Sequence, residues 1–99
     1  MASVKKLVTS DYQVFGTVQG VFFRKYTKIE ADKLKLGGWV KNSHDGSVVG
    51  TVQGPEDKVT EMKKWLMTKG SPHSFISRCE FRNEHSIEKM EFSGFKIRH

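Results

Sequence analysis

The chain has 99 residues, of which 36% are hydrophobic and 28% are charged. This size and composition are typical of one small globular domain, so we expect residues 1–99 to form a single α+β or similar unit with one core. The apolar runs are too short to cross a bilayer, no signal-peptide pattern opens the chain, and the single cysteine cannot form an internal disulfide. These features argue against membrane insertion and favour a cytoplasmic setting.

The chain is basic, with a net charge of +6 and an isoelectric point near 9.6. This excess of positive charge favours binding to nucleic acid, to an anionic membrane or to a small anionic ligand. The lysines are scattered along the sequence and form no block. A dispersed basic surface is usually solvated, and it can also concentrate a ligand that carries phosphate.

The first residues predict a free terminus followed by a strand. Residues 1–6 are expected to be frayed. Residues 8–15 alternate in the manner of a strand, with Tyr12 and Val14 on one face and Phe15 on the other. A glycine-containing loop then leads into a helical pattern.

This pattern predicts a helix over residues 23–36, which Gly37 and Gly38 end. Apolar and small residues at helical spacing define its expected core face, namely Phe23, Thr27, Ala31 and Leu34. A neighbouring stripe is also expected in the core, namely Phe22, Tyr26 and Ile29.

A hairpin and a second helix are expected next. Strands over residues 38–42 and 47–53 flank a tight turn that contains Asp45-Gly46. The second helix begins at Pro55, with two acids in its first turn, and ends before Gly70. Its expected inner face consists of Val59, Met62 and Leu66, with Trp65 beside it.

The last quarter predicts a fourth strand over residues 76–83, with Cys79 and Phe81 on one side. Residues 83–89 are polar and are expected to form a loop, and Phe92, Phe95 and Ile97 indicate a short final strand. The order is therefore β-α-β-β-α-β plus a terminal strand. This order predicts an α+β, ferredoxin-like split βαβ sandwich, with two helices on one face of a mainly antiparallel sheet.

The loop between the first strand and the first helix is the most informative stretch. Gly16 and Gly20 bracket it, and glycine lets the backbone approach a ligand closely. The first N–H groups of the following helix lack partners and lie at the positive end of its dipole. The positive charge of Arg24 in the first turn is unfavourable at this end of the dipole. It becomes favourable if an anion lies between the loop and the guanidinium. A structural corner with a solvated arginine is the alternative.

A five-residue repeat helps to separate these alternatives. Residues 16–20 recur as residues 50–54, and each copy is expected at a strand-to-helix junction. The second copy leads into a proline and two acids, which remove one N–H donor and repel phosphate. An anion site, if present, belongs to the first copy, and the second is expected to be structural.

Other catalytic constellations are missing from the sequence. No cysteine–histidine cluster predicts a metal site, and no cofactor motif is present. The histidines are expected at the surface, in turns, loops or the tail, namely His44, His73, His85 and His99. No nucleophile, general base or carboxylate pair accompanies the loop. An enzyme built on it would depend on positioning and electrostatics, as phosphoryl transfer allows.

Two motifs resemble those of the acylphosphatase family. The first is Gly16-x-Val18-Gln19-Gly20-Val21-x-Phe23-Arg24, and the second is Gly38-Trp39-Val40-x-Asn42. Asp45-Gly46 and Gly54-Pro55 also fall where members of that family have them. The similarity extends from about Tyr12 to the end of the chain, and the motifs agree in both order and spacing.

The resemblance implies hydrolysis of acyl phosphates to a carboxylate and inorganic phosphate, without a metal or a covalent intermediate. It implies that Arg24 and the loop amides hold the phosphate and that Asn42 orients the attacking water. A phosphate oxygen of the substrate would take the proton of that water. The expected phosphate-binding residues are Gly16, Thr17, Val18, Gln19, Gly20, Val21, Phe22, Phe23 and Arg24.

The chain departs from the family pattern at some positions, and the resemblance also implies binding partners. Ser43 replaces a threonine that is frequent after the asparagine, and Phe22 resembles the organ-common type of the family. The expected partners are small-molecule acyl phosphates, with the aspartyl-phosphate intermediates of ion pumps as a further candidate. The protein is expected to be a monomer that binds no nucleic acid.

Two other classes remain as alternatives. RNA-recognition domains share the element order and the basic charge, but they stack bases on aromatic residues of the central strands. Residues 47–53 contain no aromatic residue, which argues against such a module. A non-catalytic regulator could bind phosphorylated partner proteins through the same loop. Turnover of an aroyl phosphate separates the enzyme from both.

Overall fold

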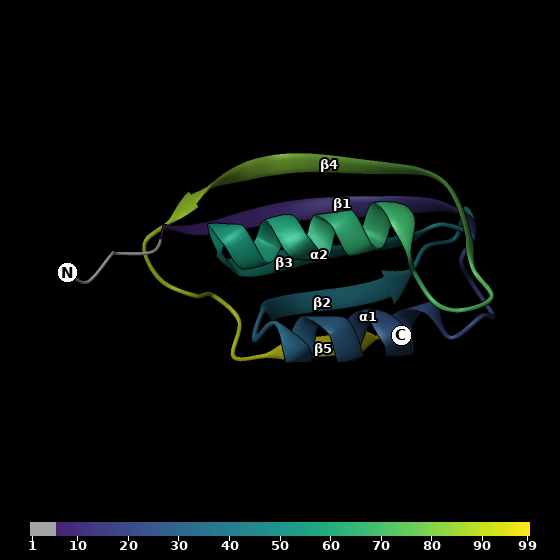
Figure 1. The fold of residues 1–99 in the computed structure, drawn as a ribbon, viewed down its shortest axis with the longest axis horizontal. Helices are drawn as coiled ribbons and strands as arrows, with labels where there is room; N and C mark the ends of the chain where they lie inside the picture. Colours follow the sequence, from purple (N-terminus) through teal and green to yellow (C-terminus); the bar gives the residue numbers. More distant parts are fainter. Residues whose placement is uncertain (1–5) are drawn as a thin grey trace.

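A five-stranded sheet with two helices on one face makes up residues 6–99, which are the residues that this computed structural model describes (Figure 1). The elements in chain order are β1 (Leu7–Thr17), α1 (Phe23–Lys33), β2 (Gly37–Asn42), β3 (Val48–Pro55), α2 (Glu56–Thr68), β4 (Phe75–Ile87) and β5 (Phe95–Arg98). The strand order is β4-β1-β3-β2-β5, and only the β2–β5 pair is parallel. The expected ferredoxin-like α+β fold is confirmed.

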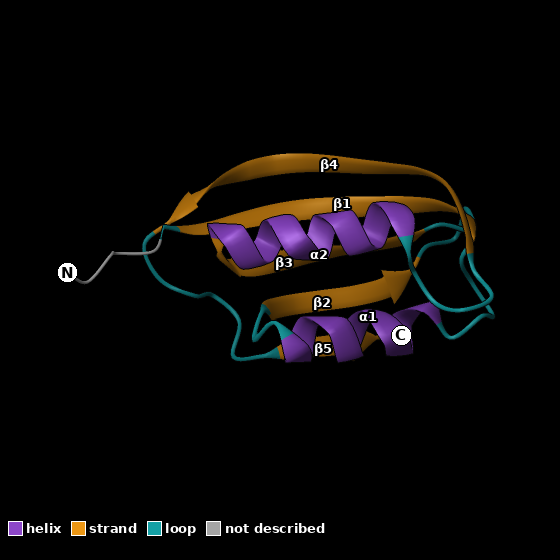
Figure 2. Cartoon of the chain, viewed as in Figure 1, coloured by secondary structure: helices purple, strands orange, loops and turns teal. Residues whose placement is uncertain are grey.

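The core lies between the sheet and the two helices. On α1 the side chains of Phe23, Thr27 and Ala31 are buried, as their spacing predicts. The Thr27 hydroxyl, which would otherwise be unsatisfied there, donates to the Phe23 carbonyl at 2.7 Å. On α2 the predicted inner face is buried as well, namely Val59, Met62 and Leu66. The two helices run side by side along the direction of the strands (Figure 2).

The second predicted stripe of α1 is wrong for Phe22 and Ile29, whereas Tyr26 is half-buried. The side chain of Phe22 is 70% exposed and that of Ile29 is 50% exposed. The helix packs on the sheet with one face, so a stripe beside that face reaches solvent. Some of the side chains that were expected in the core therefore lie at the surface.

Several boundaries also differ from the sequence-based prediction. β1 continues through Gly16 and Thr17, and α1 ends at Lys33. β4 continues to Ile87, so residues 83–87 of the expected polar loop belong to a strand, which includes His85, and only residues 88 and 89 lie outside it. The long β1 supplies pairing partners over this length, with Thr9 opposite His85. Because β4 is an exposed edge strand, polar side chains there do not signal a loop.

The second copy of the repeat lies inside β3, and α2 follows that strand directly. The first copy ends β1 and enters the loop before α1, so the two copies have different conformations. The C-terminal ends of β1 and β2 and the N-terminal end of α1 meet at one end of the molecule, on the right in Figure 1. Parallel pairing of β2 with β5 brings the chain's last residues to the same end, with Lys41 opposite Arg98.

Candidate functional site

A solvent-open pocket of about 360 Å³ occupies this end of the molecule. Its lining combines the loop, the first turn of α1, the end of β2 and the chain terminus, namely Val18, Gly20, Phe22, Phe23, Arg24, Lys25, Asn42, Ile97 and His99. The structure thus brings Arg24 and Asn42 to one cavity. Gly16, Thr17, Gln19 and Val21 contribute no lining to it.

The loop has a left-handed backbone at two positions on the pocket wall. The φ angle is +76° at Gly20 and 60° at Phe22, which is the N-cap residue of α1. Within the described residues, no backbone N–H from Gln19 to Phe22 donates to a protein acceptor. No acidic residue occupies the first turn of α1. The amides here and at the start of the helix are therefore free to bind an anion.

Arg24 is half-buried on the pocket wall and is tied to the chain terminus. Its Nη1 donates to the Arg98 carbonyl at 3.1 Å and contacts His99 Nδ1 at 3.2 Å. A guanidinium can only donate, so Nδ1 is the acceptor and a neutral His99 carries its proton on Nε2. These contacts hold one end of the Arg24 guanidinium, and the remaining N–H groups are available to a ligand.

Asn42 is the last residue of β2 and is half-buried in the pocket wall. Within residues 6–99 its side-chain amide makes no hydrogen bond to another residue. The amide therefore keeps both its donors and its acceptor for a ligand or a water molecule. The neighbouring strand β5 ends beside it, which explains why the last residues of the chain share its pocket.

The Gln19 side chain joins the loop to the turn that follows Asn42. Its Nε2 donates to the Ser43 carbonyl at 2.7 Å and to the Ser47 carbonyl at 2.8 Å. The side chain is therefore occupied by the β2–β3 turn. Gln19 fixes the position of the loop relative to the end of β2, which carries Asn42.

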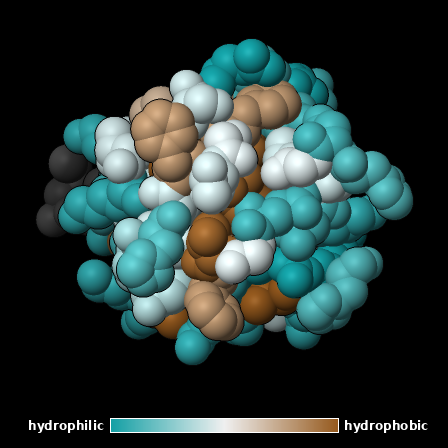
Figure 3. Space-filling model, turned by 90° about the vertical axis from the view of Figure 1, so that its right-hand side faces the viewer, coloured by the Kyte–Doolittle hydropathy of each residue, from teal (hydrophilic) through white to brown (hydrophobic). Residues whose placement is uncertain are grey.

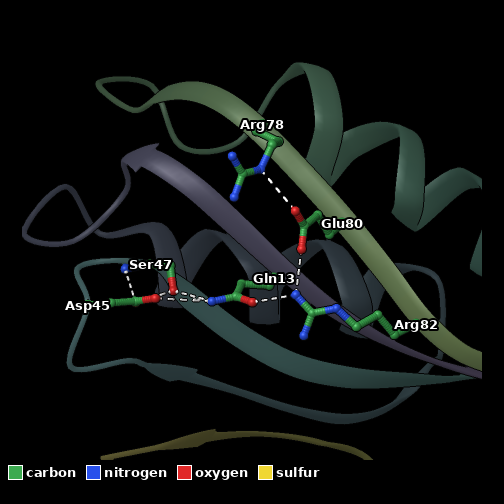
Figure 4. Close-up of polar contacts among 6 residues, drawn as sticks. All are labelled: Gln13, Asp45, Ser47, Arg78, Glu80 and Arg82. Atoms are coloured by element: carbon green, nitrogen blue, oxygen red, sulfur yellow. Dashed lines mark hydrogen bonds and ion pairs between the residues drawn. The ribbon is translucent and has the colours of Figure 1, made fainter.

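A polar network on the open face of the sheet holds the same turn from the other side (Figure 4). Asp45 accepts hydrogen bonds from the Ser47 N–H at 2.9 Å and from its hydroxyl at 2.5 Å, and these bonds lower the pKa of Asp45. Gln13 Nε2 donates to the Ser47 hydroxyl at 2.9 Å, while Gln13 Oε1 accepts from Arg82 at 2.7 Å. The turn is thus bonded both to the loop and to β1.

Sequence reasoning missed three pocket residues, namely Lys25, Ile97 and His99. Ile97 was expected only as part of a short strand, and His99 only as an exposed tail residue. No local signal could place them, because their position follows from the parallel pairing of β5 with β2. Lys25 follows Arg24 in the first turn, and its sequence position alone could have suggested it.

Other candidate chemistry lies elsewhere or is missing from the described part of the chain. In residues 6–99 there is no group of three or more His, Cys, Asp or Glu side chains that could hold a metal ion. No helix among these residues has the length and apolar character needed to span a membrane. Cys79 is half-buried in β4, outside the pocket lining, and burial raises the pKa of its thiol to about 11.

Comparisons with known proteins agree with these motifs. A family model described as acylphosphatase matches residues 10–97. The chain is 54% identical over 99 residues to acylphosphatase-2 of Homo sapiens, with both chains covered completely. The resemblance to the organ-common type rests on Phe22 alone.

Solved structures give the same result. An acylphosphatase from Bacillus subtilis is similar with a TM-score of 0.84 and 35% identity, over 93% of this chain and 99% of that one. An acylphosphatase from Coxiella burnetii has a TM-score of 0.81 and 32% identity, over 98% of this chain and 100% of that one. The chain belongs to the acylphosphatase family of enzymes.

Proposed function

We propose that the protein hydrolyses the carboxyl–phosphate bond of acyl phosphates in a substrate-assisted reaction that needs no metal ion. The observation that carries this proposal is the shared pocket, in which unpaired loop amides, Arg24 and Asn42 line one cavity. Arg24, the unpaired amides of residues 19–22 and those of the first turn of α1 bind the phosphate. Asn42 aligns a water molecule with the phosphorus, opposite the bond to the acyl oxygen.

The electron and proton balance is simple. The water oxygen forms a bond to phosphorus, and the bond from phosphorus to the acyl oxygen breaks and leaves a carboxylate. A non-bridging phosphate oxygen takes a proton from the water. The carboxylate is a good leaving group that needs no acid, and catalysis reduces to alignment and charge stabilisation.

The side chains of the pocket support a mechanism that uses no side-chain base. His99 is its one imidazole, and its Nδ1 accepts from Arg24. The other nitrogen then carries the proton and cannot accept another. The Lys25 ammonium group can only donate hydrogen bonds. The oxygen that receives the proton is therefore on the substrate.

We also propose that the chain works as a single-domain monomer in the cytoplasm. One copy of the chain already brings Arg24, Asn42 and the loop to a single pocket, which supports a site that works without a second copy. Small acyl phosphates are the proposed substrates. Aspartyl-phosphate intermediates of ion pumps are a further candidate because the pocket opens to solvent at the end of the molecule.

Release of benzoate and phosphate from benzoyl phosphate tests the activity. We expect saturable turnover that inorganic phosphate inhibits competitively. Phosphate binding in a calorimeter without turnover of benzoyl or acetyl phosphate would contradict the hydrolase and favour a non-catalytic phosphate-binding regulator.

Metal independence gives a second test. We expect dialysis against EDTA to leave kcat/KM for benzoyl phosphate unchanged, since Arg24 and the amides supply the positive charge. Samples with added Mg²⁺ or Zn²⁺ serve as controls. An activity lost on dialysis and restored only by one of these ions would contradict the mechanism.

The repeat predicts opposite effects for two glycines. An added Cβ at Gly20 meets nothing within 4 Å, but the φ of +76° is strained for alanine, and Gly20 is part of the pocket lining. At Gly54 the Cβ would lie 2.4 Å from Leu36 Cδ2 in the core. We expect Gly54→Ala to lose about 1–3 kcal/mol of stability with kcat/KM retained in the folded fraction. We expect Gly20→Ala mainly to lose activity. If both variants lost the same activity for each degree by which the melting temperature falls, this assignment would be contradicted.

Gln19 is expected to act on turnover through its bonds to the β2–β3 turn. Gln19→Ala removes the link between the loop and the end of β2, so Asn42 loses its alignment while Arg24 stays in place. We expect kcat to fall about 10-fold to 100-fold, more than the phosphate affinity falls. Gln13→Ala, which frees the same turn from the opposite side, is the matched control. An equal fall in kcat in both variants would show that Gln19 acts only by general stabilisation of the turn.

A further inference from the structure

The pocket is larger than the phosphate site needs, and the remaining part is mostly apolar. The loop amides, Arg24 and Asn42 account for the phosphate and the water. Besides His99, which contacts Arg24, five side chains of the lining have no role in that chemistry, namely Val18, Phe22, Phe23, Lys25 and Ile97. Four of these five are apolar.

Phe22 is the most exposed of these apolar side chains. It is 70% exposed, whereas the adjacent Phe23 is 2% exposed and packs against Trp65 in a tilted arrangement, with 5.7 Å between the ring centroids. The Phe22 ring thus does not contribute to the core. Viewed from this end, apolar side chains gather near the middle of the surface, between hydrophilic ones (Figure 3).

The backbone at Phe22 makes this exposure more informative. Its φ of 60° and ψ of 26° are left-handed, which is unfavourable for a bulky residue and free for glycine. Strained positions of this kind collect at functional sites. The carbonyl of Phe22 accepts from the Tyr26 N–H at 3.1 Å, so the residue is anchored to the helix. The conformation directs an aromatic ring to the rim of the pocket.

Lys25 lies next to this ring. Its Nζ is 5.9 Å from the centroid of the Phe22 ring, which is within the range of a cation–π contact. The lysine therefore supports one side of the ring and adds positive charge near the mouth of the pocket. Ile97, half-buried at the end of β5, adds an apolar contact within the same cavity.

We propose that Phe22 is the platform on which the acyl group of the substrate stacks, so that the enzyme favours acyl phosphates with a flat, aromatic acyl group over small aliphatic ones. This inference rests on the proposed hydrolysis of acyl phosphates and adds the substrate class. The phosphate anchors one end of the ligand, and the aromatic acyl group covers apolar surface that is otherwise exposed.

The test compares benzoyl phosphate with acetyl phosphate in wild-type protein and in Phe22→Gly. Glycine keeps the left-handed backbone and removes only the ring. We expect the ratio of kcat/KM values, benzoyl over acetyl, to fall about threefold to tenfold. Phe22→Tyr, which keeps a ring, should retain the wild-type ratio. Phe75→Ala is the matched control, because Phe75 is 67% exposed and does not line the pocket.

Binding of the non-hydrolysable analogues benzoylphosphonate and acetylphosphonate separates this inference from the hydrolysis itself. We expect calorimetry to show the same threefold to tenfold loss of the benzoyl preference in Phe22→Gly. Absence of turnover, together with the expected loss of the benzoyl preference in binding to Phe22→Gly, would overturn the proposed function alone. An unchanged ratio in Phe22→Gly, in rates or in binding, overturns the role of Phe22. The same change of the benzoyl-over-acetyl ratio in Phe75→Ala would also overturn the role of Phe22.

Discussion

Replacing Arg24 with alanine is expected to lower kcat/KM for benzoyl phosphate by at least about 10²–10³-fold, the typical loss when one preorganised donor is removed. A charged donor that can bind two oxygens should cost no less. Inhibition by inorganic phosphate is expected to disappear as well. The side chain is only half-buried and its protein partners lie at the chain terminus, so the variant should still fold.

Two controls make this expectation specific. Arg24→Lys keeps the charge but loses the planar pair of donors, and we expect intermediate phosphate inhibition. Arg78→Ala removes an arginine of β4 that stacks on Phe15 at 4.1 Å and lies outside the pocket lining, so its turnover should match wild type. A folded Arg24→Ala protein with near-normal phosphate inhibition would show that the anion is held without this side chain.

The parts of the site that are local in sequence could be predicted. The loop with Arg24 follows from one strand, two glycines and one helix start, and the position of Asn42 at a strand end follows from the tight turn after it. The role of Asn42 came only from the family resemblance, because asparagine is common where a strand enters a turn. The core faces of both helices follow from spacing, since each helix buries a single stripe. Bringing Arg24 and Asn42 together needed the family resemblance, because spacing does not fix which strand ends share a pocket.

The parts that depend on pairing between distant segments could not be predicted. Ile97 and His99 reach the pocket because β5 pairs in parallel with β2, and the residues themselves carry no sign of that pairing. The role of the Gln19 side chain depends on two carbonyls of a turn more than 20 residues away. Phe22 was assigned to the core because an aromatic at helical spacing usually is buried. Its left-handed backbone places it on the rim.

Replacing Asn42 with alanine is expected to separate binding from chemistry. The side chain makes no hydrogen bond to another residue within 6–99, so its loss should leave the fold and the β2–β3 turn intact. Arg24 and the amides still hold the anion, and calorimetric titration with inorganic phosphate should give an affinity within about twofold of wild type. We expect kcat for benzoyl phosphate to fall by about three orders of magnitude or more, because an unaligned water loses its effective molarity.

Two further variants test whether the amide itself acts. Asn42→Asp keeps the shape but places a carboxylate beside the phosphate, so we expect it to lose phosphate affinity as well as turnover. Asn83→Ala removes an asparagine of β4 whose side chain donates to Asp11 at 2.9 Å and does not line the pocket. This variant should leave both the phosphate affinity and the turnover unchanged. If Asn42→Ala kept most of its turnover, another group would position the water. If it lost phosphate affinity in step with turnover, Asn42 would be a binding residue, and the division of work between the loop and the strand end would be wrong.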